Sequence, residues 1–117
     1  MRINLKRIYE PYDAADGFRI LVERLWPRGM SKEQAKVDLW IKDAGASPEL
    51  RAWFGHDPLK WEEFRRRYFG EIRARPEVIA RIRDEIRAHD TVTFLFAAHD
   101  SRHNNAVALK EFLEEDQ

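Results

Sequence analysis

Hydrophobic positions along the chain form three short runs that predict strands. In residues 2–9 ("RINLKRIY") apolar and polar residues alternate, with Ile3 and Leu5 on one face, which predicts a half-buried strand at the outside of a sheet. Residues 18–25 ("FRILVERL") and 91–98 ("TVTFLFAA") are instead apolar at consecutive positions. Both faces of these two segments are therefore apolar, as expected for central strands that are covered on both sides.

Helix signals separate these strands. Ser31 and Gln34 form a capping box, and a helix that begins at Ser47-Pro48 should end at Gly55. Three further helices are predicted from their first residues and their apolar stripes, and they begin at Asp57-Pro58, at Pro76 and near Asp100-Ser101.

The order of these elements indicates a fold class. Residues 36–42 ("KVDLWIK") alternate as well and indicate a short extended segment between two helices. Strands separated by helices are typical of an α/β fold, here a small, largely parallel sheet with helices on both faces. The chain has 117 residues and no repeat or linker, so we expect one compact domain, 1–117.

The composition of the chain excludes several classes of binding partner. The 21 Lys and Arg residues balance the 21 Asp and Glu residues, so the whole molecule has no net charge to attract a polyanion or a membrane. The absence of cysteine excludes disulfides, thiolate nucleophiles and thiolate metal sites. No hydrophobic signal core or run of roughly 20 apolar residues is present. We therefore expect a soluble, cytoplasmic protein, and no cofactor, since no nucleotide-binding motif appears.

Polar side chains follow both predicted central strands, at the edge where ligands bind to parallel sheets. The first of these strands ends in Glu23, Arg24, Trp26 and Arg28, and the second is followed by His99, Asp100, Arg102, Asn104 and Asn105. If the two strands are neighbours, these two groups face each other.

We expect Arg24 to pair with a carboxylate, because charged side chains are rarely buried without an oppositely charged partner. Glu23 points to the opposite face of the strand, so Asp100 is the best candidate. Two interpretations stay open. Arg24, held by Asp100, offers its remaining donors to an anion, or the pair is a structural ion pair that closes the sheet.

The segment Trp26-Pro27-Arg28-Gly29 predicts a rigid turn. Pro27 fixes its own φ and Gly29 can adopt a positive φ, so the turn aims Arg28 in one direction. A guanidinium held in this way suits a phosphate or a carboxylate. Trp26 is expected to pack in the core or to form a wall of the site.

The segment "HDSRHNNA" offers hydrogen-bonding groups. Asp100 or Ser101 is expected to cap the last helix. Asn104 and Asn105 are poor helix formers, and hydrogen bonds of their side chains explain them better than helix stability does.

Histidines are weak candidates for catalysis. His99 could act as a general acid or base, but a merely hydrogen-bonded role is favoured. No third ligand accompanies His99 and His103, so no metal site is predicted. His56 lies in a tight turn ("WFGHDP") for which a plain surface connection is favoured; it could join a site only if this turn folds over the edge of the sheet.

The run Arg65-Arg66-Arg67 suggests nucleic-acid binding at first sight. Glu62 and Glu63 on the same helix can pair with Arg66 and Arg67 at i,i+4 spacing. A solvated, charge-laced face is therefore favoured, and nucleic acid is not the expected partner. The nearby tryptophans leave a protein-interaction or regulatory module as the alternative function.

Several segments together resemble one family. "RILVERLWPRGMSKE", "DLWIKD", "SPELRAWFGHDP" with "WEEF", and "FLFAAHDSRHNNA" are similar to signature segments of the YeaO-like family, and the resemblance covers nearly the whole chain. This is a bacterial family of small single-domain proteins of unknown function. It usually has Asp where this chain has Glu23 and commonly Lys where this chain has His99. The resemblance implies a bacterial cytoplasmic α/β protein and supplies no reaction.

The leading hypothesis from the sequence is a polar pocket at the carboxyl ends of the central strands that binds a small anionic ligand. The residues expected to form it are Arg24, Trp26, Arg28, Asp100, Asn104 and Asn105. Whether the protein catalyses a reaction stays open.

Overall fold

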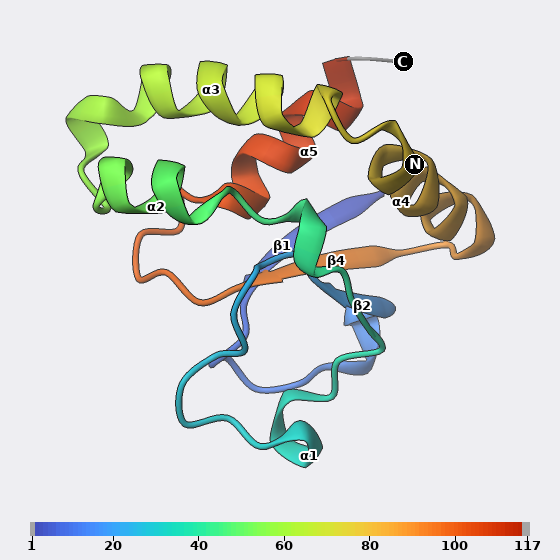
Figure 1. The fold of residues 1–117 in the computed structure, drawn as a ribbon. Helices are drawn as coiled ribbons and strands as arrows, with labels where there is room; N and C mark the ends of the chain where they lie inside the picture. The colour runs from blue at the N-terminus through green and yellow to red at the C-terminus, as the bar shows by residue number, and fades with distance from the viewer. Residues whose placement is uncertain (1, 116–117) are drawn as a thin grey trace.

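A four-stranded parallel sheet forms the centre of the computed structural model, which describes residues 2–115 (Figure 1). The strands are β1 (Ile3–Arg7), β2 (Phe18–Leu21), β3 (Leu39–Trp40) and β4 (Val92–Phe96), in the spatial order β1-β4-β2-β3. Every neighbouring pair runs parallel. The predictions of an α/β fold with a parallel sheet and of an outer first strand are therefore confirmed. The two central strands, whose order the sequence left open, are neighbours.

The register brings the ends of β2 and β4 together. Leu21 at the end of β2 pairs with Leu95, and all five residues of β4 are buried. The chain continues from both strands in the same direction. The residues that follow the two strands therefore lie at one edge of the sheet, which we call the carboxyl edge.

Five helices connect and cover the strands (Figure 1). They are α1 (Lys32–Ala35), α2 (Pro48–Phe54), α3 (Trp61–Arg73), α4 (Pro76–Ala88) and α5 (Asn105–Glu115). The predicted caps are confirmed, since Ser31 and Gln34 form a capping box and α2 begins after Ser47 and ends at Gly55. Among the residues described, no helix combines the length and the apolar character that crossing a membrane requires.

The last helix begins later than the sequence indicates. Asn104, and not Asp100 or Ser101, caps α5, because its Oδ1 accepts a hydrogen bond from the N–H of Val107 (3.0 Å). Asp100 instead stabilises the turn before the helix by accepting from the N–H groups of Arg102 and His103. Asn and Asp both suit a cap, so the sequence alone does not decide between the two positions.

The two faces of the sheet have unequal covers. Helices α2 to α5 pack over one face and form the main core with β2 and β4 (Figure 1). The other face is covered by the segment between β2 and β3, which contains only the single-turn helix α1. Its small core contains Ile8, Leu21, Ala35 and Leu95, with Trp26 and Trp40 packed against them. A long loop, more than a helix, therefore closes this second face.

Candidate functional site

Glu23 lies two residues beyond β2 at the carboxyl edge. Its Oε1 accepts a hydrogen bond from the N–H of Ala97 (2.9 Å), the first residue beyond β4. Its own carbonyl accepts from the indole of Trp40 (2.6 Å), which fixes its backbone. Within residues 2–115, Oε2 accepts no hydrogen bond and no ion pair involves Glu23. Because no buried side-chain polar atom of these residues lacks a partner, Oε2 must reach solvent.

The surroundings of Glu23 oppose its ionisation. Burial raises the pKa of its carboxyl above the ordinary value, and the Ala97 N–H and the charges of Arg51 and His56 only partly offset this effect. Arg51 belongs to α2 and His56 to the turn that follows it. Their charges therefore act on Glu23 from beyond ion-pair distance. The turn that contains His56 lies over the carboxyl edge, the condition under which it could join a site.

The backbone at His56 is held in an uncommon conformation. His56 has a φ of +57° and follows Gly55, whose φ is +52°. A non-glycine residue in the left-handed region costs about 1 kcal/mol or more, and such residues gather at functional sites. Among residues 2–115, only Lys36 shares this feature. Arg51 is exposed, and its side chain makes no hydrogen bond or ion pair in the part of the chain described.

Asp100 and His103 form a hydrogen-bonded pair in the turn between β4 and α5. Asp100 Oδ2 lies 2.7 Å from Nδ1 of His103, while its Oδ1 accepts from the N–H groups of Arg102 (2.8 Å) and His103 (3.1 Å). Hydrogen bonds from the Arg102 backbone and from His103 lower the pKa of Asp100. Nε2 of His103 has no hydrogen-bond partner among the residues described. The carboxylate thus orients the imidazole and leaves its other nitrogen available.

An aromatic cluster links the two histidines. The ring of His103 meets Trp61 edge-on, with centroids 5.3 Å apart. Trp61 lies 6.1 Å from Phe54, and Phe54 lies 6.4 Å from His56. His56 and His103 therefore flank the same cluster. We call Glu23, Arg51, His56, Asp100 and His103 the carboxyl-edge site.

Arg24 has partners other than the predicted one. Its Nε donates to the carbonyls of Gly45 (3.2 Å) and Ala46 (3.1 Å), and its Nη1 lies 3.7 Å from Asp43. A Cβ at Gly45 would lie 2.6 Å from the backbone N of Arg24, so this loop is pressed against the end of β2. The prediction of an Arg24–Asp100 pair is wrong, and Arg24 ties the loop to the strand end.

Asn105 is bonded to the protein's own backbone. Its Nδ2 donates to the carbonyls of Val22 (2.8 Å) and Ala44 (3.3 Å), and its Oδ1 accepts from the N–H of Ala46 (2.6 Å). Asn104 caps α5 and also donates to the carbonyl of Asp100 (2.9 Å). The prediction that both side chains act through hydrogen bonds is confirmed. Both amide donors of Asn105 are occupied, so it has none left for a ligand.

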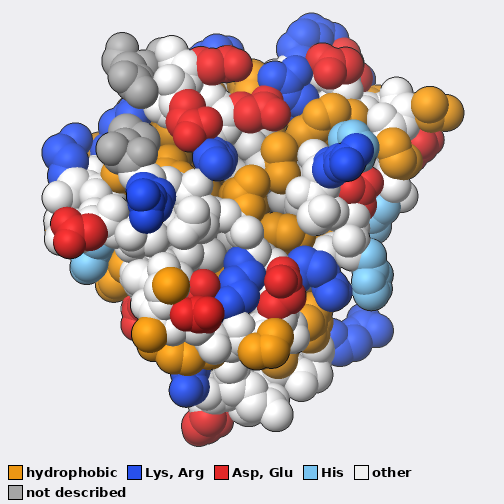
Figure 2. Space-filling view, turned by 180° about the vertical axis from the view of Figure 1, so that it is seen from behind, with side chains coloured by type: hydrophobic (Ala, Val, Ile, Leu, Met, Phe, Trp, Pro, Cys, Tyr) orange, Lys and Arg blue, Asp and Glu red, His pale blue; other side chains and the backbone are white. Residues whose placement is uncertain are grey.

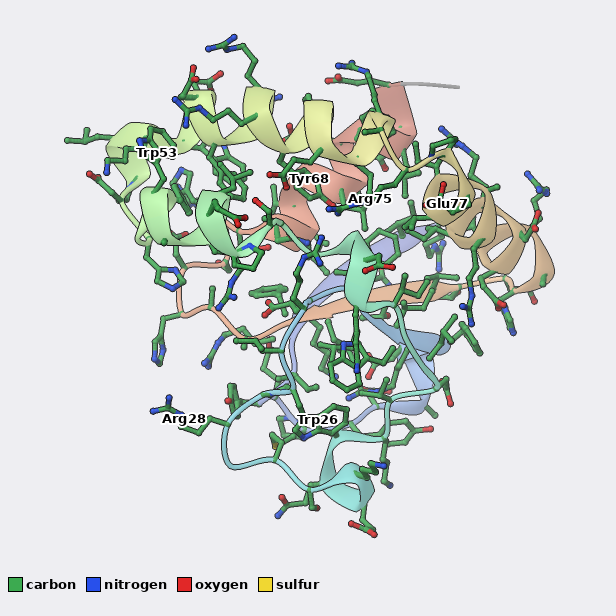
Figure 3. All side chains as sticks on the ribbon, in the orientation of Figure 1. Trp26, Arg28, Trp53, Tyr68, Arg75 and Glu77 are labelled. Carbon is green, nitrogen blue, oxygen red and sulfur yellow. The ribbon has the colours of Figure 1, made fainter. Side chains whose placement is uncertain are left out.

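The Trp26–Gly29 turn separates its two large side chains (Figure 3). Trp26 packs over the small core, donates to the carbonyl of Met30 (2.6 Å) and lies 5.4 Å from Trp40. Arg28 is exposed and points away from the body of the molecule (Figure 3). Its carbonyl accepts from the hydroxyl of Tyr9 (2.7 Å). The turn is thus fixed, but it aims Arg28 outward. His99 is exposed as well.

The arginine run on α3 is paired within the protein. Arg67 pairs with Glu63 (2.7 Å) as predicted. The Glu62–Arg66 pairing is wrong, because Arg66 also pairs with Glu63 and Glu62 pairs with Arg65. Figure 2 shows acidic and basic side chains intermingled on the rear face of the molecule. These ion pairs support a solvated face and not a nucleic-acid surface.

Two further observations narrow the interpretation. Trp53 and Trp61 are partly buried against the main core, which counts against a tryptophan-based docking patch. Among residues 2–115, no group of three or more His, Asp or Glu side chains could hold a metal ion.

The sequence did not identify Arg51 or His103 as ligand-binding residues. Arg51 resembles any solvated charge on a short helix, and its one signal is its place one turn before the Gly55-His56 turn. His103 was considered only together with His99, as an acid-base pair or as metal ligands. Its pairing with Asp100 depends on a turn that the predicted helix start had hidden.

The fold is a small parallel α/β domain with polar side chains at its strand ends. A family model matches residues 2–117, and the chain belongs to the family it describes, the inactive DUF488-N3 subclade. The chain is 36% identical over 113 residues to the uncharacterised protein YeaO of Escherichia coli (strain K12), a match that covers 97% of both chains. It is 35% identical over 112 residues to the uncharacterised protein Rv3073c of Mycobacterium tuberculosis (strain H37Rv), covering 96% of this chain and 93% of that protein. The resemblance to YeaO-like proteins is confirmed. No solved structure gives a significant match.

Proposed function

We propose that the protein binds, without catalysis, a small ligand that carries an anionic group and a hydrogen-bond donor. The observation that carries this proposal is the approach of Arg51 and His56, two side chains with free donors, to the open carboxylate of Glu23, with His103 on the same aromatic cluster as His56. The anionic group would be a phosphate or a carboxylate, which a guanidinium binds through two parallel hydrogen bonds.

The incomplete pairing of Glu23 supports a ligand at this edge. A carboxylate in a partly buried place is normally paired with a cation. Glu23 has only the Ala97 N–H, while Arg51 and His56 act on it without touching it. This leaves room for a ligand whose anion meets Arg51 and whose donor meets Oε2 of Glu23. The word inactive in the family description supports binding over catalysis.

Arg28 is the competing anion ligand, because the sequence assigned it that role. It is exposed and lies on the outward turn, whereas Arg51 lies close enough to Glu23 to influence its ionisation. Arg24, Asn104 and Asn105 would then hold the edge in shape and would not contact the ligand. We therefore assign the anion to Arg51.

Calorimetric titration of three variants tests this assignment. Inorganic phosphate, ribose 5-phosphate and citrate serve as probes, each at two salt concentrations, because nonspecific attraction between exposed charges is screened by salt. We expect saturable binding of at least one probe to the parent protein. Arg51→Ala should weaken it about tenfold or more, since a charge-assisted bidentate contact is lost.

Arg28→Ala and Arg81→Ala are the matched controls. Arg81 is an exposed arginine of α4, away from the carboxyl edge. Both variants should bind within about twofold of the parent, the effect of a distant surface charge. Absence of saturable binding in the parent would refute the function. A selective loss in Arg28→Ala would instead transfer the anion to the Trp26–Gly29 turn.

A further inference from the structure

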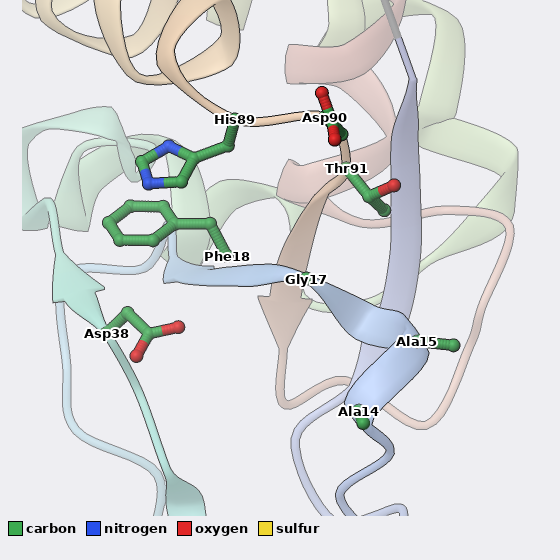
Figure 4. Close-up of a pocket in the computed structure, with 8 residues that line it drawn as sticks. All are labelled: Ala14, Ala15, Gly17, Phe18, Asp38, His89, Asp90 and Thr91. Carbon is green, nitrogen blue, oxygen red and sulfur yellow. The ribbon is translucent and has the colours of Figure 1, made fainter.

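A hollow of about 450 Å³ lies at the opposite edge of the sheet, where β2 and β4 begin (Figure 4). It is open to solvent, and Asp38 and Asp90 at its rim are exposed. The turn of Ala14, Ala15 and Gly17 forms one side, and Phe18 and His89 form the other. A Cβ at Gly17 would lie 2.3 Å from the carbonyl oxygen of Thr91, and its φ is +68°. Glycine therefore lets this turn reach the start of β4.

The two aspartates that line the hollow have carboxylate oxygens that are free to accept hydrogen bonds. Asp38 accepts the N–H of Arg19 through Oδ2 (2.9 Å), and its Oδ1 accepts nothing from the residues described. Asp90 makes no side-chain hydrogen bond or ion pair within residues 2–115. No Lys or Arg lines the hollow. In a chain with no net charge, this is a locally negative place.

His89 presents a third acceptor. Its Nδ1 lies 2.9 Å from the carbonyl oxygen of Glu85. A carbonyl can only accept, so Nδ1 carries the proton, and Nε2 of the neutral ring is an acceptor without a partner among the residues described. A ligand that matches Asp38, Asp90 and His89 must therefore donate several hydrogen bonds.

The aromatic wall sets the shape of the ligand. The rings of Phe18 and His89 are stacked, with centroids 3.9 Å apart and planes 12° apart. Figure 4 shows Asp38 beside this stack, on the side of Phe18 away from His89. Flat cations lie against aromatic rings, whereas a compact ammonium keeps its hydration more strongly.

We propose that this hollow is a binding site for a small molecule that carries a guanidinium group. A guanidinium is planar, has a delocalised positive charge and presents its N–H donors in one plane, which fits acceptors arranged beside a flat aromatic wall. The two aspartates disfavour an anion. This site shares no residue with the carboxyl-edge site and lies at the other end of the strands, so the two proposals stand or fall separately.

Amide chemical shifts measured by NMR during titration test the proposal, with methylguanidinium as probe and methylurea as its neutral analogue of the same shape. We expect saturable shifts at Gly17, His89 and Thr91 with methylguanidinium and none with methylurea at equal concentration. Methylammonium, with the same charge and no plane, should bind more weakly.

Asp38→Asn is the diagnostic variant. The amide oxygen of Asn can still accept the Arg19 N–H, so the variant removes the charge and keeps this bond. It should weaken methylguanidinium binding at least about fivefold, as expected for the loss of one charged acceptor. Glu77→Gln is the control, since it removes a carboxylate from the exposed start of α4 (Figure 3) and should change nothing.

Three results would refute binding at this hollow, and a fourth would refute the guanidinium. The first three are shifts that rise linearly without saturation, equal binding of methylurea, and an Asp38→Asn variant that binds like the parent. Tighter binding of methylammonium than of methylguanidinium would reject the guanidinium and its planar contact.

Discussion

Asp16 and Glu23 lie just before and a little beyond β2, and the protein surrounds these two carboxylates differently. Asp16 is bonded to Nζ of Lys6 (3.0 Å), to the N–H of Asp13 (3.1 Å) and to Nη1 of Arg19 (2.5 Å). Burial acts to raise the pKa of Asp16, but the bonds from Lys6, Asp13 and Arg19 outweigh it and hold the pKa below the ordinary value. Glu23 has one backbone N–H, and burial raises its pKa.

The difference separates a structural network from a candidate site. Arg19 is only 1% exposed and donates also to the carbonyls of Lys36 (3.0 Å) and Ala35 (2.8 Å), so the group around Asp16 is complete. At the carboxyl edge Arg51 and His56 make no ion pair among the residues described, and Glu23 keeps an open oxygen. A buried charge that is fully paired holds a fold together, whereas one left incomplete is a place for a ligand.

The largest expected effect comes from breaking the complete network. Arg19→Met removes one partner of Asp16 and leaves the carbonyls of Ala35 and Lys36 without a donor. Asp16 keeps Lys6 and the Asp13 N–H, so we expect the free energy of unfolding to fall by about 2–4 kcal/mol, mainly because two buried carbonyls lose their donor. Urea unfolding followed by circular dichroism measures it.

Arg81→Ala is the control for this prediction, because Arg81 is exposed on α4. Its unfolding free energy should stay within about 0.5 kcal/mol of the parent. A loss below about 1 kcal/mol in Arg19→Met would mean that the network contributes little and that the comparison with Glu23 fails.

A smaller effect is expected from the scaffold of the carboxyl edge. Asn105→Ala leaves the carbonyl of Val22 and the N–H of Ala46 without their partner. We expect a loss of about 2–3 kcal/mol in the same unfolding measurement, because two buried backbone groups become unsatisfied. Asn104→Ala, which removes only a helix cap and one further bond, should cost about 1 kcal/mol. Equal losses in both variants would contradict the bridging role of Asn105.

The smallest effect is a pH dependence of opposite sign at the two carboxylates. The pKa of Glu23 in the folded protein is above its ordinary value of 4.5, so ionisation destabilises the fold. Below that value the carboxyl is protonated in both states. As the pH rises through the folded pKa, the parent should lose stability relative to Glu23→Gln, which cannot ionise.

Asp16 provides the contrasting profile. Its pKa in the folded protein is below the ordinary value of 3.8, so its stabilisation is present above that value and is lost as the pH falls through the folded pKa. Asp16→Asn should therefore lack the acid loss of stability that the parent shows. Unfolding free energies between about pH 3 and about pH 8 measure both profiles. Parallel profiles for Glu23→Gln and the parent would remove Glu23 as the exceptional carboxylate.

Much of the fold could be predicted from local pattern. The consecutive apolar residues of β2 and β4 indicated buried parallel strands, and the caps at Ser31, Ser47 and Gly55 located two helices. The position of the polar edge could be predicted from the same two strands, because polar residues follow the apolar run of each. The start of α5 could not be predicted in this way, because several residues that can cap a helix stand in a row before it.

The roles of the polar residues at that edge could not be predicted in the same way. Arg24, Asn105 and Arg19 all bond to backbone carbonyls of segments 16 to 83 positions away in the chain. Every residue has a carbonyl, so such a partner leaves no signal in the sequence. Arg24 was expected to bind Asp100 because a carboxylate is the only partner for a guanidinium that a sequence displays by residue type.

Sequence by itself determined the parallel α/β domain, its edge of polar residues and its family, because apolar spacing and motif order are written residue by residue. Only the tertiary structure decided which of those polar side chains are hydrogen-bonded within the protein and which keep free donors or acceptors. The carbonyls of the loop around Gly45 accept the hydrogen bonds of Arg24 and Asn105. Helix α2 and the turn after it place Arg51 and His56 where their charges act on Glu23. The physical reason is that a hydrogen-bonding group is free or satisfied only in relation to backbone that the fold brings to it.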